Sequence, residues 1–122
     1  MSPAANRARL AFAFAFPLGA LLHFWWVAQH GLLYHGPAPA WAVWFWYGLC
    51  ALDFVICWLF LTRPRLGLAA GVAAMAVSLA VNWLCFPTFE HQFNWVLLGL
   101  TAFGLVLFAT TPWLWRRSPA RV

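Results

Sequence analysis

Four long apolar runs dominate the pattern of hydrophobic and polar positions along the chain. They cover residues 10–30, 41–62, 66–86 and 93–115. Each is close to the roughly 20 residues that an α-helix needs to cross a hydrocarbon core at about 1.5 Å per residue. A β-barrel would instead need short alternating strands. The pattern predicts an all-α integral membrane bundle of four transmembrane helices, forming a single transmembrane domain over residues 1–122.

The segments between the apolar runs are short. Pro37 and Pro39 interrupt the chain after the first run, Pro64 lies between the second and third, and Pro87 follows the third. Short connections make consecutive helices antiparallel neighbours. We therefore expect an up-down-up-down bundle.

The charged residues are distributed unevenly between the two sets of connections. All seven basic residues are arginines, and they lie before the first run, between the second and third, and after the fourth: Arg7, Arg9, Arg63, Arg65, Arg116, Arg117 and Arg121. Because cytoplasmic loops of membrane proteins are enriched in arginine and lysine, this distribution predicts cytoplasmic termini (N-in/C-in). The use of arginine without lysine, with many Ala and Trp residues, favours a bacterial inner membrane protein.

Composition agrees with a lipid environment. Hydrophobic residues make up 66% of the chain and charged residues 7%, whereas soluble domains carry about 25% charged residues. The main partner is therefore expected to be the lipid bilayer. The net charge of +5 does not indicate nucleic-acid binding, because the arginines cluster at the ends of apolar runs instead of forming one polar face.

Polar side chains within the apolar runs are the best candidates for function, because they are costly in lipid. His23, Asp53 and Asn82 are expected to line a ligand or proton path that descends from the outer surface. Asp53 lies about 18 Å below the outer end of its helix, near mid-membrane. A carboxylate there without a cation is expected to take up a proton. Three roles remain open for Asp53: a structural hydrogen-bond donor, a proton- or cation-coupling group, or a contact to a partner subunit.

Tryptophans are concentrated toward the outer ends of the helices. They are interpreted either as interfacial anchors or as the wall of a pocket that opens outward, with Trp44 and Trp83 as the wall candidates beside the polar path. The third run carries a row of small residues, Gly67, Gly71, Ala74 and Ser78. Such rows allow helices to approach closely, so this one predicts packing within the chain or a dimer interface.

The histidines expected at the outer face are possible metal ligands. His30, His35 and His91, with Glu90, are the candidates, and such a set can bind zinc or copper. Their spacing matches no recognised metal motif, so no metal site and no cofactor are predicted. The chain also lacks a phosphate-binding glycine loop and a nucleophile elbow, so an enzyme is not expected.

Three functions remain open from the sequence. The favoured one is a non-enzymatic accessory or assembly subunit that acts through helix contacts within a homo-oligomer or larger membrane complex. The second is a small homo-oligomeric transporter or ligand-binding bundle that uses Asp53 and His23 in a Trp-rich pocket. The third is a membrane protein that binds metal through its outer histidines.

Overall fold

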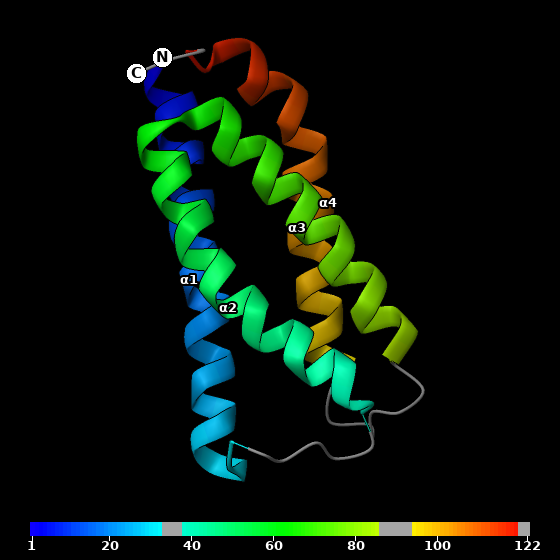
Figure 1. Ribbon diagram of the computed structural model, residues 1–122. Helices are drawn as coiled ribbons and strands as arrows, with labels where there is room; N and C mark the ends of the chain where they lie inside the picture. Colours follow the sequence, from blue (N-terminus) through cyan, green and yellow to red (C-terminus); the bar gives the residue numbers. More distant parts are fainter. Residues whose placement is uncertain (33–37, 86–93, 120–122) are drawn as a thin grey trace.

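The computed structural model describes residues 1–32, 38–85 and 94–119, and these residues form four α-helices (Figure 1). They are α1 (Pro3–His30), α2 (Ala40–Thr62), α3 (Pro64–Cys85) and α4 (Asn94–Arg117). Each helix contains a stretch long and apolar enough to span a membrane. The architecture is therefore that of an all-helical, multi-pass membrane protein.

The first helix begins at Pro3, well before the predicted boundary at residue 10. The Ser2 side chain accepts a hydrogen bond of 3.3 Å from the Ala5 N–H, and Pro3 occupies the first helical position. Both residues favour a helix start. The apolar pattern alone missed residues 3–9 of this helix, because Asn6, Arg7 and Arg9 are polar yet compatible with a helix.

A single residue, Arg63, separates α2 from α3, so the two helices form a tight hairpin. Gly67 makes this close approach possible. A Cβ atom at Gly67 would lie 2.6 Å from Phe60 Cα and 2.7 Å from the Leu59 carbonyl carbon. No side chain fits at this position without moving the backbone of α2.

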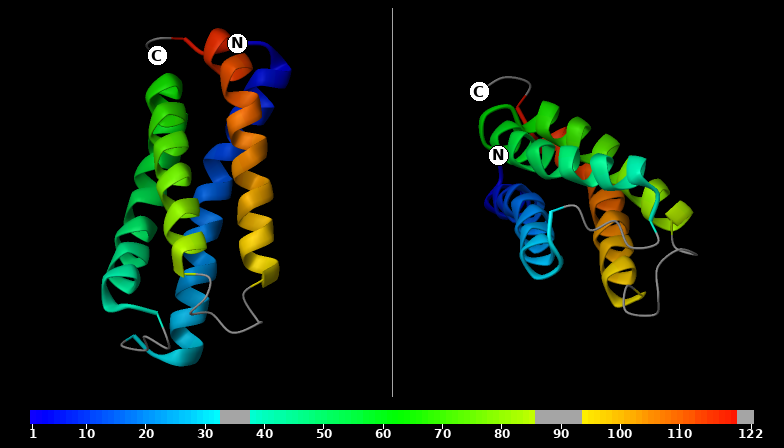
Figure 2. Two further views of the ribbon diagram at one scale, coloured as in Figure 1. Left: turned by 90° about the vertical axis from the view of Figure 1, so that its right-hand side faces the viewer. Right: turned by 60° about the horizontal axis from the view of Figure 1, so that its bottom comes forward.

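The four helices are arranged in two layers, with α2 and α3 in one and α1 and α4 in the other (Figures 1 and 2). Contacts are most extensive between α1 and α2, then between α2 and α3 and between α3 and α4, and they are fewer between α1 and α4. The start of α1, the α2–α3 turn and the end of α4 lie at the same end of the molecule (Figure 1), which we call the terminal end.

The packed core occupies the half of the bundle nearest the terminal end. Its centre is a group of aromatic rings from three helices, with centroid distances of 5.9 Å for Phe12–Phe103, 5.8 Å for Phe16–Phe103 and 6.0 Å for Phe16–Phe60. Ile56, Leu68, Met75, Leu107 and Leu114 complete the buried cluster. The core holds the four helices together between the terminal end and the site described next.

The row of small residues on α3 is buried within the chain. Gly67, Gly71, Ala74 and Ser78 are all inaccessible or nearly so. A Cβ at Gly71 would lie 3.0 Å from Phe16 Cζ and 3.1 Å from Phe60 Cε2, so the row receives side chains of α1 and α2. The outer surfaces of all four helices instead expose large apolar side chains such as Leu21, Phe54, Val77 and Leu105, as expected for surfaces in contact with lipid.

Candidate functional site

A cavity of about 770 Å³ lies between the four helices, in the half of the bundle away from the terminal end. All four helices contribute to its wall. Ligand pockets in proteins typically measure about 300–1,000 Å³ and combine an apolar wall with a few polar groups. The cavity is therefore large enough for a small organic molecule.

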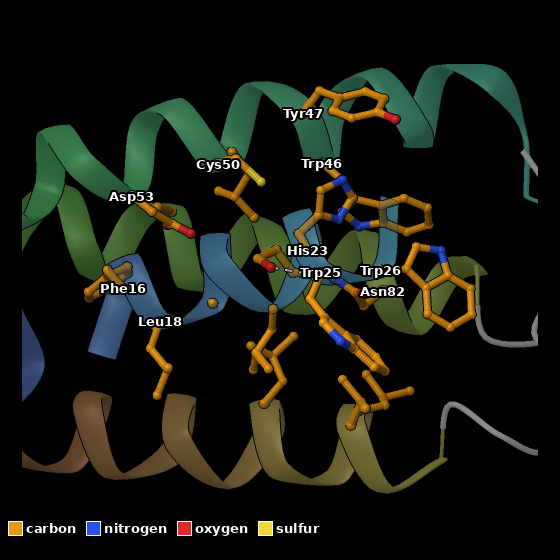
Figure 3. A pocket seen from close by; sticks show the side chains of 18 of the residues that line it. Phe16, Leu18, His23, Trp25, Trp26, Trp46, Tyr47, Cys50, Asp53 and Asn82 are labelled. Atoms are coloured by element: carbon orange, nitrogen blue, oxygen red, sulfur yellow. Dashed lines mark hydrogen bonds between the residues drawn. The ribbon is translucent and has the colours of Figure 1, made fainter. Parts of the chain in front are cut away.

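The wall of the cavity is mainly aromatic and aliphatic (Figure 3). Phe16 and Phe103 belong to both the core and the cavity wall, so the packed core forms its floor. Toward the opposite end the wall is formed by the rings of Trp25, Trp26 and Trp46. An apolar body of a ligand would contact these groups.

Asp53 of α2 points into the cavity (Figure 3). Its side chain is 8% exposed, and it forms no hydrogen bond or ion pair with any residue that the structure describes. The opposing helix α1 presents Gly19, whose Cβ, if one were present, would lie 3.7 Å from Asp53 Oδ2. Because Gly19 has no side chain, α1 places no side-chain atom of this residue against the carboxyl oxygen.

His23 of α1 is the second polar group in the wall. Its ring meets the Tyr47 ring edge-to-face, with centroids 5.2 Å apart and an interplanar angle of 88°. Its Nε2 atom is buried and has no hydrogen-bond partner within the described part of the chain. The Tyr47 hydroxyl donates a hydrogen bond to the Leu32 carbonyl oxygen, which links α2 to the residues that follow α1.

Asn82 and Ser78 of α3 also line the cavity but interact with each other. Asn82 Nδ2 donates to the Ser78 carbonyl oxygen at 2.8 Å and lies 3.4 Å from Ser78 Oγ. The polar path predicted from His23, Asp53 and Asn82 thus corresponds to three side chains around one cavity. Among the described residues, the Asp53 carboxyl and His23 Nε2 have no hydrogen-bond partner, whereas the Asn82 amide group bonds to Ser78.

Trp44 and Trp83, the tryptophans chosen from the sequence as pocket wall, lie outside it. Trp44 is 64% exposed on the outer surface of α2. Trp83 donates its Nε1 hydrogen to Thr101 Oγ1 at 3.1 Å, on the exposed side of α3 and α4. Helical register explains the difference, because Trp46 precedes Asp53 by about two turns and shares its face, whereas Trp44 lies about 180° away. The helical position relative to Asp53 would have identified Trp46 as the tryptophan of α2 in the cavity wall.

The outer-face metal candidates are not brought together in the described residues. His30 stacks on Trp26 with centroids 3.7 Å apart, and its Nδ1 donates to the Trp26 carbonyl oxygen at 3.0 Å. His35, Glu90 and His91 lie outside the residues that the structure describes. Within residues 1–32, 38–85 and 94–119, no group of three His, Cys, Asp or Glu side chains is placed to hold a metal ion.

The cavity opens sideways between α1 and α4. Several of its wall residues are also exposed on the outer surface, namely Leu18, Leu22 and Trp25 of α1 and Val96 and Gly99 of α4. A Cβ at Gly99 would meet no atom within 4 Å, so the opening is not filled at this point. The side chains around this opening, Leu18, Leu22, Trp25 and Val96, are apolar and exposed.

No protein family model, curated protein or solved structure matches the chain. The geometry of the cavity is therefore the basis for assigning a function.

Proposed function

We propose that this protein binds a small, mainly apolar molecule that carries a polar group, as a membrane-embedded binding protein or transporter. The single observation that carries the proposal is the cavity, in which an apolar wall surrounds two polar groups, the Asp53 carboxyl and His23 Nε2, that have no hydrogen-bond partner among the described residues. A bound molecule would place its apolar part against the rings and its polar part at these two side chains.

Buried polar groups without hydrogen bonds reduce the stability of a protein. A polar group that is removed from water without a hydrogen bond costs about 1–3 kcal/mol in proteins. Asp53 and His23 both occupy such positions, although isosteric apolar residues would pack there without that cost. Residues held at this cost are a feature of functional sites within membranes.

The accessory-subunit hypothesis favoured by the sequence gains less from the structure. The sequence leaves the row of small residues on α3 open between packing within the chain and a dimer interface. Gly67, Gly71, Ala74 and Ser78 are all buried within the chain, and Gly67 and Gly71 lie against α2 and against α1 and α2, respectively. The cavity therefore supports the transporter or binding bundle more directly, and the homo-oligomer expected for it belongs to this proposal.

The proposal includes an orientation in a bacterial inner membrane. Both termini lie in the cytoplasm in this orientation, and the four helices cross the membrane in alternating directions, up-down-up-down. The arginine distribution supports this orientation, because Arg7, Arg9, Arg63, Arg65 and Arg117 all lie on segments at the terminal end of the bundle (Figure 1). The cavity would then lie in the outer half of the membrane.

The test is native mass spectrometry of the protein extracted gently from its own membrane. We expect species at a multiple of 13.8 kDa that retain a bound small molecule. Gly99→Trp should reduce the fraction with bound ligand, because the indole would fill the opening between α1 and α4. Gly48→Trp is the matched control, because Gly48 is also exposed, also has no atom within 4 Å of a built Cβ, and lies outside the cavity wall.

Two results would contradict the proposal. One is a complex dominated by another polypeptide with no small molecule bound, which would favour the accessory-subunit function. The other is equal ligand retention in Gly99→Trp, Gly48→Trp and the unaltered protein, which would place any bound molecule outside the cavity.

A further inference from the structure

We infer that the ligand is a lipophilic organic cation, such as a quaternary or protonated amine on an apolar body, and that the Asp53 carboxylate is its counter-ion. This inference rests on the proposed function, because it names the chemical class that the same cavity would take. Four features of the described cavity carry it: its charge, the access to Asp53, its aromatic wall and its opening.

The charge of the cavity is one-sided. The titratable side chains in its described wall are His23 of α1 and Tyr47, Cys50 and Asp53 of α2, whereas α3 and α4 contribute none. No arginine is among the described residues of the wall, and no ion pair links His23 to Asp53. A buried carboxyl group must be neutralised, either by a proton or by a cation. A cationic ligand would neutralise the Asp53 carboxylate, whereas an anionic ligand would meet a group of its own charge.

The carboxyl group is buried yet reachable from inside the cavity. Asp53 is 8% exposed, so water and lipid have little direct access from outside. Its Oδ2 faces Gly19, where no side chain covers it. A larger residue at position 19 would have shielded the oxygen, so the pairing of Gly19 with Asp53 leaves room for an atom of the ligand.

The aromatic wall suits a cation that has lost its water. Trp46 lies on the same face of α2 as Asp53, and the rings of Trp25, Trp26 and Tyr47 border the same space (Figure 3). Aromatic faces attract ammonium groups, with about 0.5–1 kcal/mol per contact at exposed sites and about 2 kcal/mol when desolvated. A carboxylate together with several aromatic rings is the arrangement that recognises quaternary ammonium groups.

The lateral opening between α1 and α4 favours a molecule that dissolves in lipid. Leu18, Leu22 and Val96 border it, so the entry is apolar. A small hydrophilic cation would lose its hydration on this route without compensation. A cation attached to an aromatic or alkyl body would keep favourable contacts throughout.

The experiment compares two probes of the same shape in nanodiscs of zwitterionic phosphatidylcholine. One is benzyltrimethylammonium, and the other is neopentylbenzene, its uncharged carbon isostere. Binding isotherms are followed by ligand-observed saturation-transfer NMR, with empty nanodiscs as the background. We expect the unaltered protein to bind the cation at least about tenfold more tightly than the isostere. A tenfold difference in affinity corresponds to about 1.4 kcal/mol.

Asp53→Asn removes the charge and keeps the shape of the side chain. We expect this variant to lose the preference for the cation and to bind both probes with similar affinity. Retention of the full preference in Asp53→Asn would overturn the assignment of Asp53 as counter-ion. The comparison of the two probes on the unaltered protein needs no variant, so it holds even if Asp53→Asn fails to fold.

The outcomes separate this inference from the proposed function. Saturable binding of neopentylbenzene at least as tight as that of benzyltrimethylammonium would refute the cation while leaving a ligand-binding cavity. Binding of neither probe would refute the cation inference too, and the proposed function would then be decided by whether native mass spectrometry finds a bound small molecule.

Discussion

Alanine substitution of individual glycines tests the helix packing described above. In an ordinary helix interior, Gly→Ala stabilises by about 1 kcal/mol, because alanine loses less backbone entropy on folding. At Gly67 the new methyl group would lie 2.6 Å from Phe60 Cα and 2.7 Å from the Leu59 carbonyl carbon. Both are backbone atoms, so α2 and α3 must separate.

The expected magnitude follows from these two opposing terms. Overpacking costs about 1–3 kcal/mol where side chains can adjust, and a backbone contact should cost at least the upper value. After subtracting the gain of about 1 kcal/mol in helix propensity, Gly67→Ala should destabilise by about 2 kcal/mol. Gly71→Ala should be close to neutral, since its Cβ would meet only the ring edges of Phe16 and Phe60, at 3.0 Å and 3.1 Å.

Gly99→Ala is the matched control, because a Cβ at Gly99 would meet no atom within 4 Å. It should be neutral or stabilising by up to about 1 kcal/mol, which leaves about 2–3 kcal/mol between it and Gly67→Ala. The assay is reversible unfolding in mixed micelles with increasing dodecyl sulfate, followed by circular dichroism and repeated at several protein concentrations.

Equal free energies of unfolding for Gly67→Ala and Gly99→Ala would refute this account of the α2–α3 contact. A different failure is also informative. If Gly67→Ala leaves the free energy of unfolding unchanged but weakens a concentration-dependent association, the row of small residues forms a dimer interface instead of an internal contact.

Three further predictions concern the cavity wall, the core and the orientation. Trp46→Leu should weaken benzyltrimethylammonium binding about fivefold, whereas Trp44→Leu, on the outer surface of the same helix, should leave it unchanged in the same NMR titration; equal effects would contradict the assigned wall. Phe60→Ala, at a site 1% exposed, should cost about 3 kcal/mol in the micelle unfolding assay, whereas Phe54→Ala, which faces lipid, should cost less than about 1 kcal/mol. Green fluorescent protein fused to the C-terminus should fluoresce and alkaline phosphatase should be inactive there, and active phosphatase would reverse the proposed orientation.

The sequence determined the elements of this protein because lipid leaves a chain few choices. Continuous apolar runs near 20 residues predict membrane-spanning helices, and α2, α3 and α4 begin and end within two residues of the predicted spans. The first turns of α1 escaped prediction because capping by Ser2 and Pro3, and not hydrophobicity, starts that helix. Polar side chains are rare within such runs, so the sequence also singled out Asp53 and His23, which line the cavity.

The tertiary structure decided what those residues surround. Periodicity places residues on a helix face, but the rotation of each helix is set by the side chains that pack between helices. Phe16 and Phe60 fit against Gly71, which turns α3 so that its small residues face inward.

The same packing brings Asp53, His23 and Asn82 to one cavity and leaves Trp44 and Trp83 on the surface. Depth in the membrane is a property of one helix and can be read along the chain. A cavity is a property of four helices, because its existence depends on how closely their side chains fill the space between them.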